Sequence, residues 1–167
     1  MLLETERLII SKMTVEYAPF ILELLNDPDY IRFIGDKKVK TLKEAEKHII
    51  EKYLENYNNQ KIGFYLVSLK KDKTPIGTSG LVDREGLDCH DIGFAYLPKF
   101  RGKGYAYEAA KKILDYATNE LKLNPIAAIT TKDNIKSANL LERLGLKFEK
   151  LILIPNDSEE LRLFKTQ

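Results

Sequence analysis

The chain is poor in the residues that build disulfides, metal clusters and membrane spans. Its 167 residues include one cysteine, Cys89, two histidines and no tryptophan. A single cysteine cannot form an internal disulfide, and two separated histidines do not make a zinc cluster. No apolar run approaches the ~20 residues of a membrane span, and the N-terminal residues lack the basic and apolar regions of a signal peptide. We therefore expect no metal, no membrane attachment and a cytoplasmic location.

Neither sign of charge is in excess. Lysine and arginine total 27 against 25 aspartates and glutamates, a net charge of +2. This balance gives no indication of a nucleic-acid partner or a membrane surface. The chain is long enough to bury one core, and we find no linker, internal repeat or low-complexity stretch. We predict a single domain over residues 1–167.

Strand and helix signals alternate along the chain, which is typical of a layered α/β domain. Apolar residues recur at helical spacing after Ala18, and Thr41-x-x-Glu44 is a capping box that begins a second helix. The stretch from Asp27 to Lys40 is the longest predicted irregular segment. Strand signals cover residues 6–13, 62–69, 75–83, 91–97, 126–131, 148–154 and 160–164.

The most informative motif is a glycine turn, which we define as residues 101–106, Arg-Gly-Lys-Gly-Tyr-Ala. It joins the predicted strand from Asp91 to Leu97 to a predicted alanine-rich helix. Glycine lets the backbone approach a ligand, and the free N–H groups of a helix start attract anions. The turn therefore predicts a phosphate site, although an ordinary glycine-containing turn has the same composition.

Two common phosphate motifs are excluded. A P-loop needs Lys-Ser or Lys-Thr after its last glycine, and here Lys103 lies between the glycines. A dinucleotide fingerprint needs a third glycine where this chain has Tyr107. The remaining pattern, Arg-x-x-Gly-x-Ala, resembles the pyrophosphate loop of the GCN5-related N-acetyltransferases (GNAT), and the order of elements matches that family over almost the whole chain.

Further fragments are similar to the RimJ/RimL-like branch of that family: residues 5–8 (Thr-Glu-Arg-Leu), 26–28 (Asn-Asp-Pro), 91–94 (Asp-Ile-Gly-Phe) and Asn134-x-x-Ser137. The resemblance implies a mixed, mostly antiparallel central sheet of about seven strands flanked by helices. It also implies an enzyme that moves the acetyl group of acetyl-coenzyme A (acetyl-CoA) to an amine by direct attack in a ternary complex. A homodimer is an open expectation.

The resemblance assigns two groups of residues to acetyl-CoA. Backbone N–H groups of the glycine turn would bind the pyrophosphate, with the Arg101 and Lys103 side chains nearby. Main-chain groups of the preceding strand would pair with the pantetheine arm. The pyrophosphate group comprises Arg101, Gly102, Lys103, Gly104, Tyr105 and Ala106, and the pantetheine group comprises Phe94, Ala95, Tyr96 and Leu97.

Asp91 is the preferred candidate for the general base. It precedes Leu97 by roughly 20 Å of strand at ~3.3 Å per residue, comparable with an extended pantetheine arm. Burial in an apolar strand would raise its pKa towards a useful range. The alternatives are a solvated carboxylate at the strand start, a neighbouring acid (Asp83, Glu85 or Asp88), and a chain of waters.

The helix after residue 133 carries the remaining candidates. The resemblance places Asn134 against the pantetheine arm, although Asn134 or Asp133 also suits a helix cap. Many family members have a tyrosine acid seven residues after this asparagine, but this chain has Leu141. Ser137 is then the candidate donor to the leaving thiolate, unless it bonds a carbonyl of its own helix. Asn139 is assigned to the outer part of the cofactor.

Other functions fit the sequence less well. Adjacent residues of a strand point to opposite faces, so Cys89 and His90 cannot easily share a proton. The resemblance also implies direct transfer without an acyl-enzyme, and a cysteine mechanism is therefore not expected. A catalytically silent module that binds acyl-CoA is the main alternative, because the tyrosine acid is missing. An unrelated phosphate-binding domain is less consistent with the whole-chain match. The acceptor amine is undetermined: protein N-termini, polyamines, amino acids and aminoglycoside-like compounds all remain open. Acidic residues Asp27, Asp29 and Asp36 could attract a cationic amine, although a solvated loop has the same composition.

Overall fold

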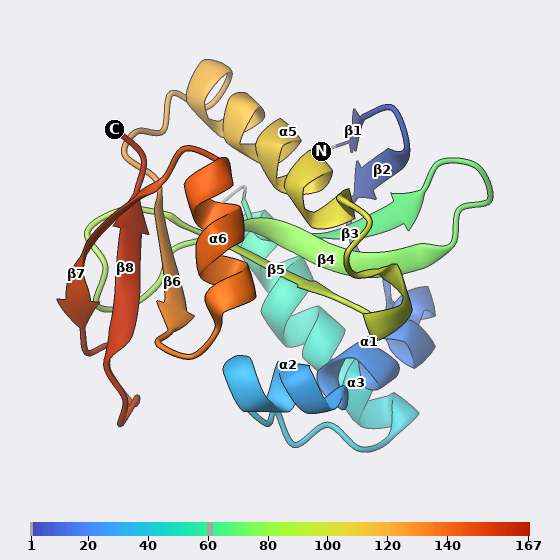
Figure 1. Ribbon diagram of the computed structural model, residues 1–167. Helices are drawn as coiled ribbons and strands as arrows, with labels where there is room; N and C mark the ends of the chain where they lie inside the picture. The colour runs from blue at the N-terminus through green and yellow to red at the C-terminus, as the bar shows by residue number, and fades with distance from the viewer. Residues whose placement is uncertain (1, 60–61) are drawn as a thin grey trace.

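The computed structural model describes residues 2–59 and 62–167. Eight strands form one sheet with helices on both faces (Figure 1). They are β1 (Leu2–Glu4), β2 (Leu8–Ser11), β3 (Phe64–Leu69), β4 (Pro75–Val82), β5 (Asp91–Tyr96), β6 (Ala127–Thr131), β7 (Lys147–Ile152) and β8 (Leu161–Lys165). Their order across the sheet is β1-β2-β3-β4-β5-β6-β8-β7. All neighbours are antiparallel except β5 and β6, which confirms the predicted mixed sheet.

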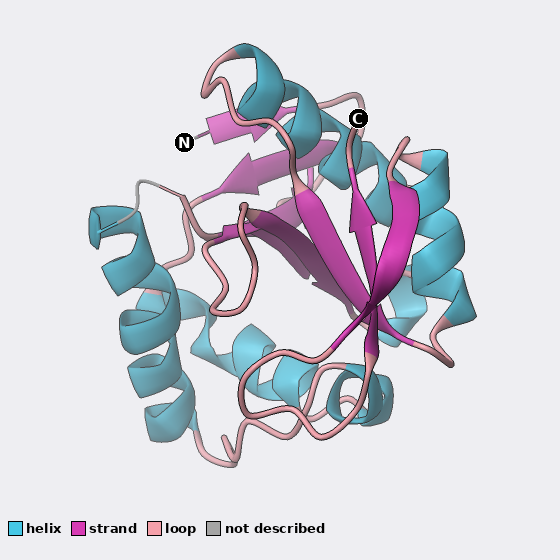
Figure 2. Cartoon of the chain, turned by 90° about the vertical axis from the view of Figure 1, so that its left-hand side faces the viewer, coloured by secondary structure: helices cyan, strands magenta, loops and turns pink. Residues whose placement is uncertain are grey.

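The helices divide between the two faces of the sheet (Figure 2). Helices α5 and α6 lie on one face, and the helices from the first third of the chain lie on the other. Their bounds are α1 (Ala18–Leu25), α2 (Pro28–Phe33), α3 (Leu42–Ile49), α4 (Glu55–Asn59), α5 (Tyr105–Asn119) and α6 (Ile135–Arg143). Short helical turns are η1 (Val15–Tyr17), η2 (Ile50–Leu54) and η3 (Pro98–Phe100).

Two elements differ from the prediction. Strand β1 is an eighth strand, too short to show an alternating pattern, and it exists because it pairs with β2. The segment predicted to be irregular after Asp27 contains α2. Asp27 caps this helix by accepting the Tyr30 N–H at 3.1 Å, and Pro28 occupies the first turn, where a missing N–H costs nothing. The Asn-Asp-Pro sequence therefore ends one helix and begins the next.

The core forms where the predicted apolar faces meet the sheet. The capping box of Thr41 and Glu44 begins α3 as predicted, and the inward residues Ala45, Ile49 and Tyr53 are buried. Helix α5 buries Ala109, Ala110, Ile113, Leu114 and Ala117. Small alanine side chains let this helix approach β4 and β5 closely, so its first turn is held firmly at the end of β5.

Strands β5 and β6 separate after a single pairing position. Asp91 pairs with Ala127, and the Ala127 N–H donates to the His90 carbonyl at 2.8 Å. Beyond that point the two strands diverge (Figure 1), and no further register pair joins them in the described chain. One edge of β5 therefore lacks a strand partner over most of its length, next to the start of α5.

Candidate active site

The glycine turn presents free donors at the start of α5. Gly104 is the N-cap residue with φ of 84°, and Gly102 has φ of 72°. Both angles lie in the left-handed region that glycine adopts without strain. Glu108 donates its N–H to the Gly104 carbonyl, whereas the N–H groups of residues 102–107 donate to no described acceptor in the protein. This cluster of N–H groups on a 15-residue helix is suited to bind an anion.

A network from the N-terminal segment fixes this turn. Arg7 pairs with Glu108 at 2.7 Å, donates to the Lys103 carbonyl at 3.0 Å, and stacks over the Tyr105 ring at 4.5 Å. Thr5 donates its hydroxyl to the other Glu108 oxygen. Burial by itself would raise the pKa of Glu108, but hydrogen bonds from Thr5 and Arg7 outweigh it and lower the pKa. In the sequence, Thr5 and Arg7 belong only to a fragment that resembles the family. In the structure, their side chains hold the glycine turn in place.

The Arg101 side chain forms hydrogen bonds and ion pairs with other residues of the protein. Its guanidinium donates to the carboxylates of Asp27 and Asp29 at 2.5 and 2.8 Å, and its Nε donates to the Tyr96 carbonyl at 2.9 Å. Asp27 is 8% exposed, so the guanidinium compensates a buried charge. Arg101 therefore ties the glycine turn to α2 and to the end of β5. The Lys103 side chain, by contrast, extends over the Phe100 ring, with its ammonium 6.0 Å from the ring centre.

The register of β5 separates the residues predicted to pair with pantetheine. Leu97 donates its N–H to the Ile76 carbonyl, so alternate residues of this antiparallel ladder, Ala95 included, direct their main-chain groups toward β4. Phe94 and Tyr96 direct theirs toward the gap beside β6. The Tyr96 carbonyl is bonded to Arg101. The open main-chain groups are therefore the N–H and carbonyl of Phe94 and the N–H of Tyr96.

Asp91 is buried at the other end of β5 from the glycine turn. Its side chain is 1% exposed and forms an ion pair with Arg84, whose side chain is 35% exposed. Burial raises the pKa of Asp91 to about 6, although Arg84 lowers it. The structure excludes the solvated carboxylate that the sequence left open. The neighbouring acids Asp83, Glu85 and Asp88 are exposed.

Helix α6 carries the residues predicted beyond β6. Asn134 is the N-cap, and its side-chain oxygen accepts the Ser137 N–H at 3.2 Å. Ser137 is partly exposed, and its hydroxyl has no described partner, so the predicted alternative of a bond to its own helix is not formed. Asn139 is exposed. Leu141 is buried at 1% exposure and belongs to the core.

The turn, the open strand edge and the buried acid together have the layout of a known enzyme domain. Residues 7–147 match the family model for an acetyltransferase (GNAT) domain. The chain belongs to the GNAT acetyltransferase family. An uncharacterized N-acetyltransferase, p20, from Bacillus licheniformis is 30% identical over 155 residues, covering 90% of this chain and 84% of that protein.

Solved structures share the fold of this GNAT domain. An acetyltransferase from Agrobacterium tumefaciens superposes with a TM-score of 0.85 at 23% identity, covering 100% of this chain and 94% of that one. A ribosomal-protein-S5-alanine acetyltransferase from Vibrio fischeri superposes with a TM-score of 0.82 at 18% identity, covering 99% and 96%. The protein is accordingly an N-acetyltransferase with the GNAT fold.

Two residues of the GNAT site carried no usable signal in the sequence. Arg84 lies in a turn without a motif, and only folding brings it against Asp91. Glu108 follows the glycine turn by one helical turn, and its partners Thr5 and Arg7 lie about a hundred positions earlier. The position of His48 among charged residues of a predicted helix predicts a solvated side chain. The structure corrects this: His48 is partly buried with its ring 6.0 Å from that of Tyr53, and burial lowers its pKa.

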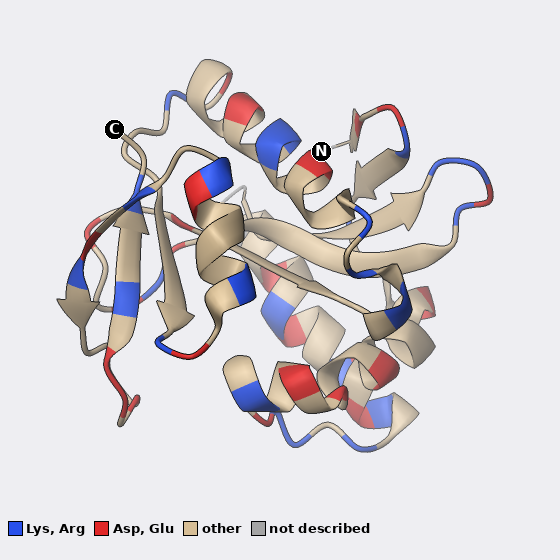
Figure 3. Ribbon diagram, in the orientation of Figure 1, with Lys and Arg blue, Asp and Glu red and all other residues tan. Residues whose placement is uncertain are grey.

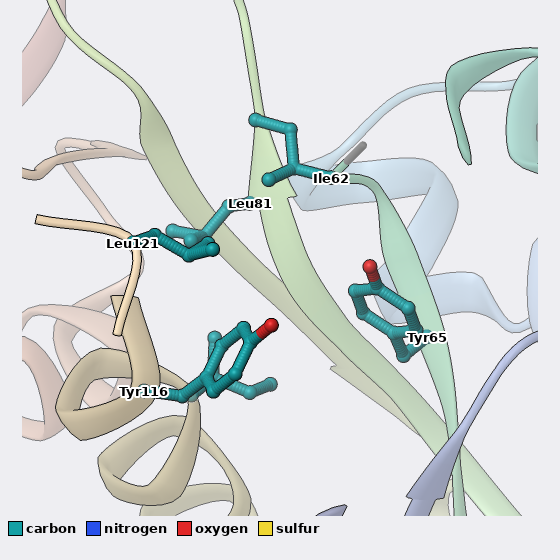
Figure 4. Close-up of a pocket in the computed structure, with 6 residues that line it drawn as sticks. Ile62, Tyr65, Leu81, Tyr116 and Leu121 are labelled. Atoms are coloured by element: carbon teal, nitrogen blue, oxygen red, sulfur yellow. The ribbon is translucent and has the colours of Figure 1, made fainter. Parts of the chain in front are cut away.

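Other features of the described chain carry no chemistry of this kind. A small apolar hollow between the sheet and α5 has room for about one water molecule (Figure 4). Its lining residues are Ile62, Tyr65, Leu81, Ile113, Tyr116 and Leu121. Among residues 2–59 and 62–167, no cluster of His, Cys, Asp and Glu has the arrangement of a metal site. Over the same residues, no helix combines the length and apolar character needed to cross a membrane. Burial raises the pKa of the Cys89 thiol, which disfavours a nucleophilic thiolate.

Proposed function

We propose that this GNAT domain transfers an acetyl group from acetyl-CoA to a primary amine by direct attack in a ternary complex. The observation that carries the proposal is the set of N–H groups at residues 102–107 that have no described acceptor. They are placed at the end of a strand edge that, beyond Asp91, has no described partner strand. This arrangement fits a ligand with a diphosphate at one end and an amide-containing arm at the other. Microcin C7 self immunity acetyltransferase MccE, which shares the fold with a TM-score of 0.82 at 16% identity over 97% of this chain and 93% of its own, is solved with acetyl-CoA and AMP.

The two ends of the cofactor would be held by different interactions. The N–H groups of Gly102 to Ala106 and the dipole of α5 suit the pyrophosphate, with the Lys103 ammonium nearby. The open main-chain groups of Phe94 and Tyr96 suit the amides of the pantetheine arm. In this proposal, Asn134 contacts the pantetheine arm and Asn139 contacts the outer part of the cofactor. Arg101 would act chiefly by holding the turn, because its donors are committed to Asp27, Asp29 and Tyr96.

Acetyl-CoA supplies the activated acyl thioester, and the chain supplies proton transfer. Asp91 is the proposed general base, because its pKa of about 6 leaves it ionised at neutral pH and able to accept a proton from the amine. Ser137 is the proposed donor toward the leaving thiolate, since its hydroxyl has no partner among the described residues and Leu141 provides no acid.

The two proposed groups approach from opposite sides of the sheet. Gly93, which shares a face with Asp91, lies under the Phe64 ring, and that ring lies 6.4 Å from Tyr53 of η2. This is the face covered by α1–α4, whereas α6 covers the other (Figure 2). The proposal therefore places the reacting atoms at the gap between β5 and β6, where both faces can reach them. The RimJ/RimL-like branch and a cytoplasmic location belong to the same proposal.

The glycine turn is tested with a matched pair of variants. Gly104→Ala and Gly145→Ala both force a side chain into a left-handed backbone, at φ of 84° and 94°. Each should lose about 1 kcal/mol of folding free energy. A Cβ at Gly104 would also lie 3.2 Å from Arg7, and nothing lies within 4 Å of one at Gly145.

We expect acetyl-CoA to raise the melting temperature of the wild type and of Gly145→Ala, and to stabilise Gly104→Ala much less. Coenzyme A release with a panel of amines then tests the transfer itself. Undiminished stabilisation of Gly104→Ala would refute the turn as the cofactor site. Cofactor binding without release from any amine would favour a silent binding module.

A further inference from the structure

An aromatic ring lies over glycines of the central strands. Phe64 of β3 pairs in register with Gly80 of β4, which pairs in turn with Gly93 of β5. A Cβ atom at Gly80 would lie 2.0 Å from the Gly63 carbonyl oxygen, and one at Gly93 would lie 2.9 Å from two carbons of the Phe64 ring. Glycine at both positions therefore lets the start of β3 approach β4 closely and lets the ring rest on the backbone of β5.

Neighbouring residues fix the position of this ring. The Tyr53 ring lies 6.4 Å away, centre to centre. The Phe64 carbonyl accepts a hydrogen bond from the Tyr57 hydroxyl, which itself accepts the Met13 N–H at 3.1 Å. Phe64 is nevertheless partly exposed, whereas the other five residues of β3 are buried. Phe64 is therefore a firmly held residue that keeps accessible surface.

The accessible part of β5 adjoins both the ring and the buried acid. Asp91 and Gly93 lie two residues apart on one face of the strand, a rise of about 6–7 Å. Along β5, Gly93, Phe94 and Ala95 are partly exposed, whereas the remaining residues are buried. On the face covered by α1–α4, a molecule that contacts β5 at Gly93 therefore touches the Phe64 ring and lies next to Asp91.

The strands around the ring are uncharged. Strands β3 and β4, and β5 beyond Asp91, contain no charged residue, and they form a tan band through the middle of the molecule (Figure 3). The charge of Asp91 is itself offset by the ion pair with Arg84. The surface that the ring offers beside Gly93 is therefore apolar.

The acids that the loop sequence suggested for attracting a cationic amine are already paired. Asp27 and Asp29 form ion pairs with Arg101, and Asp36 pairs with two lysines of its own loop at 3.1 and 3.7 Å. Their charges are thus offset within the protein, which weakens the expectation of a cationic acceptor.

The proposed reaction brings the acceptor to the ring. Strand β5 runs from Asp91 to Tyr96, and the glycine turn follows its far end. A cofactor anchored at the turn and extended along β5 would have its acyl end toward Asp91. An amine that reaches this end on the Asp91 face would have its neighbouring carbon atoms over Gly93, against the Phe64 ring.

We propose that Phe64 determines acceptor specificity, and that its ring binds an apolar group, aliphatic or aromatic, carried on the carbon chain next to the amine. The inference rests on the proposed transferase function and narrows its substrate class. An apolar group is removed from water against the ring, and an aromatic group adds the interaction between two rings. A polyamine or an aminoglycoside would instead place ammonium or hydroxyl groups there and lose part of their hydration.

The test compares primary amines that differ in the group beside the amine. 2-Phenylethylamine is paired with ethanolamine, L-phenylalaninamide is paired with glycinamide, 3-methylbutylamine is the aliphatic member, and spermidine serves as the polycation. We expect the wild type to prefer the apolar member of at least one pair by about 10-fold or more in kcat/KM. The ratio within each pair is then compared between proteins, so that differences in basicity between the amines cancel.

The variants separate the ring from the stability of β3. Phe64→Ala removes the ring, and Phe64→Leu removes its aromatic character while retaining most of the apolar packing. Val67→Ala is the control, because Val67 is fully buried on the opposite face of the same strand and loses methyl groups without touching the ring. Phe64→Ala should reduce the preference about fivefold or more, mainly by raising the KM for the apolar amine. Phe64→Leu should favour 3-methylbutylamine over 2-phenylethylamine about threefold more than the wild type does, and Val67→Ala should leave every ratio unchanged.

Binding is measured alongside turnover, so that the two proposals can fail separately. 2-Phenylethylamine and L-phenylalaninamide are titrated calorimetrically onto protein saturated with coenzyme A, and Phe64→Ala should bind the preferred one about fivefold more weakly. Turnover without a preference for apolar amines, or a preference that Phe64→Ala retains whatever its overall rate, would overturn the role of Phe64 and uphold the transferase. Amine binding that depends on Phe64, without turnover of any amine, would support the apolar site and count against transfer. Absence of both turnover and Phe64-dependent binding would overturn both proposals.

Discussion

Replacing Asp91 with asparagine tests the buried acid most directly. The substitution removes the charge and keeps an oxygen that can accept from Arg84, so local packing is retained. The folded-state pKa of about 6 lies above the ordinary 3.8, which means that the folded protein binds this proton more tightly than the unfolded chain. The resulting stabilisation is present at low pH and is lost as pH rises through 6.

The magnitude follows from the two pKa values. The difference between 3.8 and about 6, at 1.36 kcal/mol per pH unit, corresponds to about 3 kcal/mol of unfolding free energy. About 1.4 kcal/mol of this stabilisation is lost as the pH rises from 5 to 8. Urea denaturation across pH 4–8 measures the unfolding free energy of wild type and of Asp91→Asn. The difference between the two proteins gives the contribution of Asp91, because the contributions of other titrating groups cancel.

The same variant tests catalysis. With Asp91 as base, kcat/KM of the wild type should fall as pH decreases through about 6, and Asp91→Asn should lose this limb and be slower by about 100-fold or more. Asp88→Asn is the control, because Asp88 is 77% exposed in its side chain and pairs with Lys165. A stability difference that is flat with pH would refute the raised pKa, and a wild-type pH–rate profile would refute the base.

Two further substitutions test the other side chains of the site. Ser137→Ala should slow coenzyme A release roughly 10–100-fold, below the full range for general acid catalysis because water can substitute, and Ser137→Thr should recover most of the rate; an unchanged rate in the alanine variant would give Ser137 a structural role. Arg101→Gln leaves buried Asp27 without its ion pair and should cost about 2 kcal/mol of unfolding free energy while raising the KM for acetyl-CoA about tenfold. Lower stability with an unchanged KM would limit Arg101 to anchoring α2.

Much of the fold followed from local patterns. The capping box at Thr41 identified the start of α3 and the alanine-rich sequence identified α5, because capping and periodicity act over a few residues. Strand β1 and helix α2 were not predicted, since three and six residues are too few to show a period. Their existence depends on pairing with β2 and on the cap supplied by Asp27.

The features of the site also fall into those that depend on local sequence and those that depend on contacts between distant segments. The sequence by itself determined the glycine turn, the acid at Asp91 and the missing tyrosine at Leu141, because each depends on residue type and near spacing. Only the tertiary structure decided what surrounds them. It placed Arg84 against Asp91 and committed Arg101 to Asp27 and Asp29. The physical reason is that charge pairing and burial depend on distances between segments far apart in the chain, which local patterns do not encode.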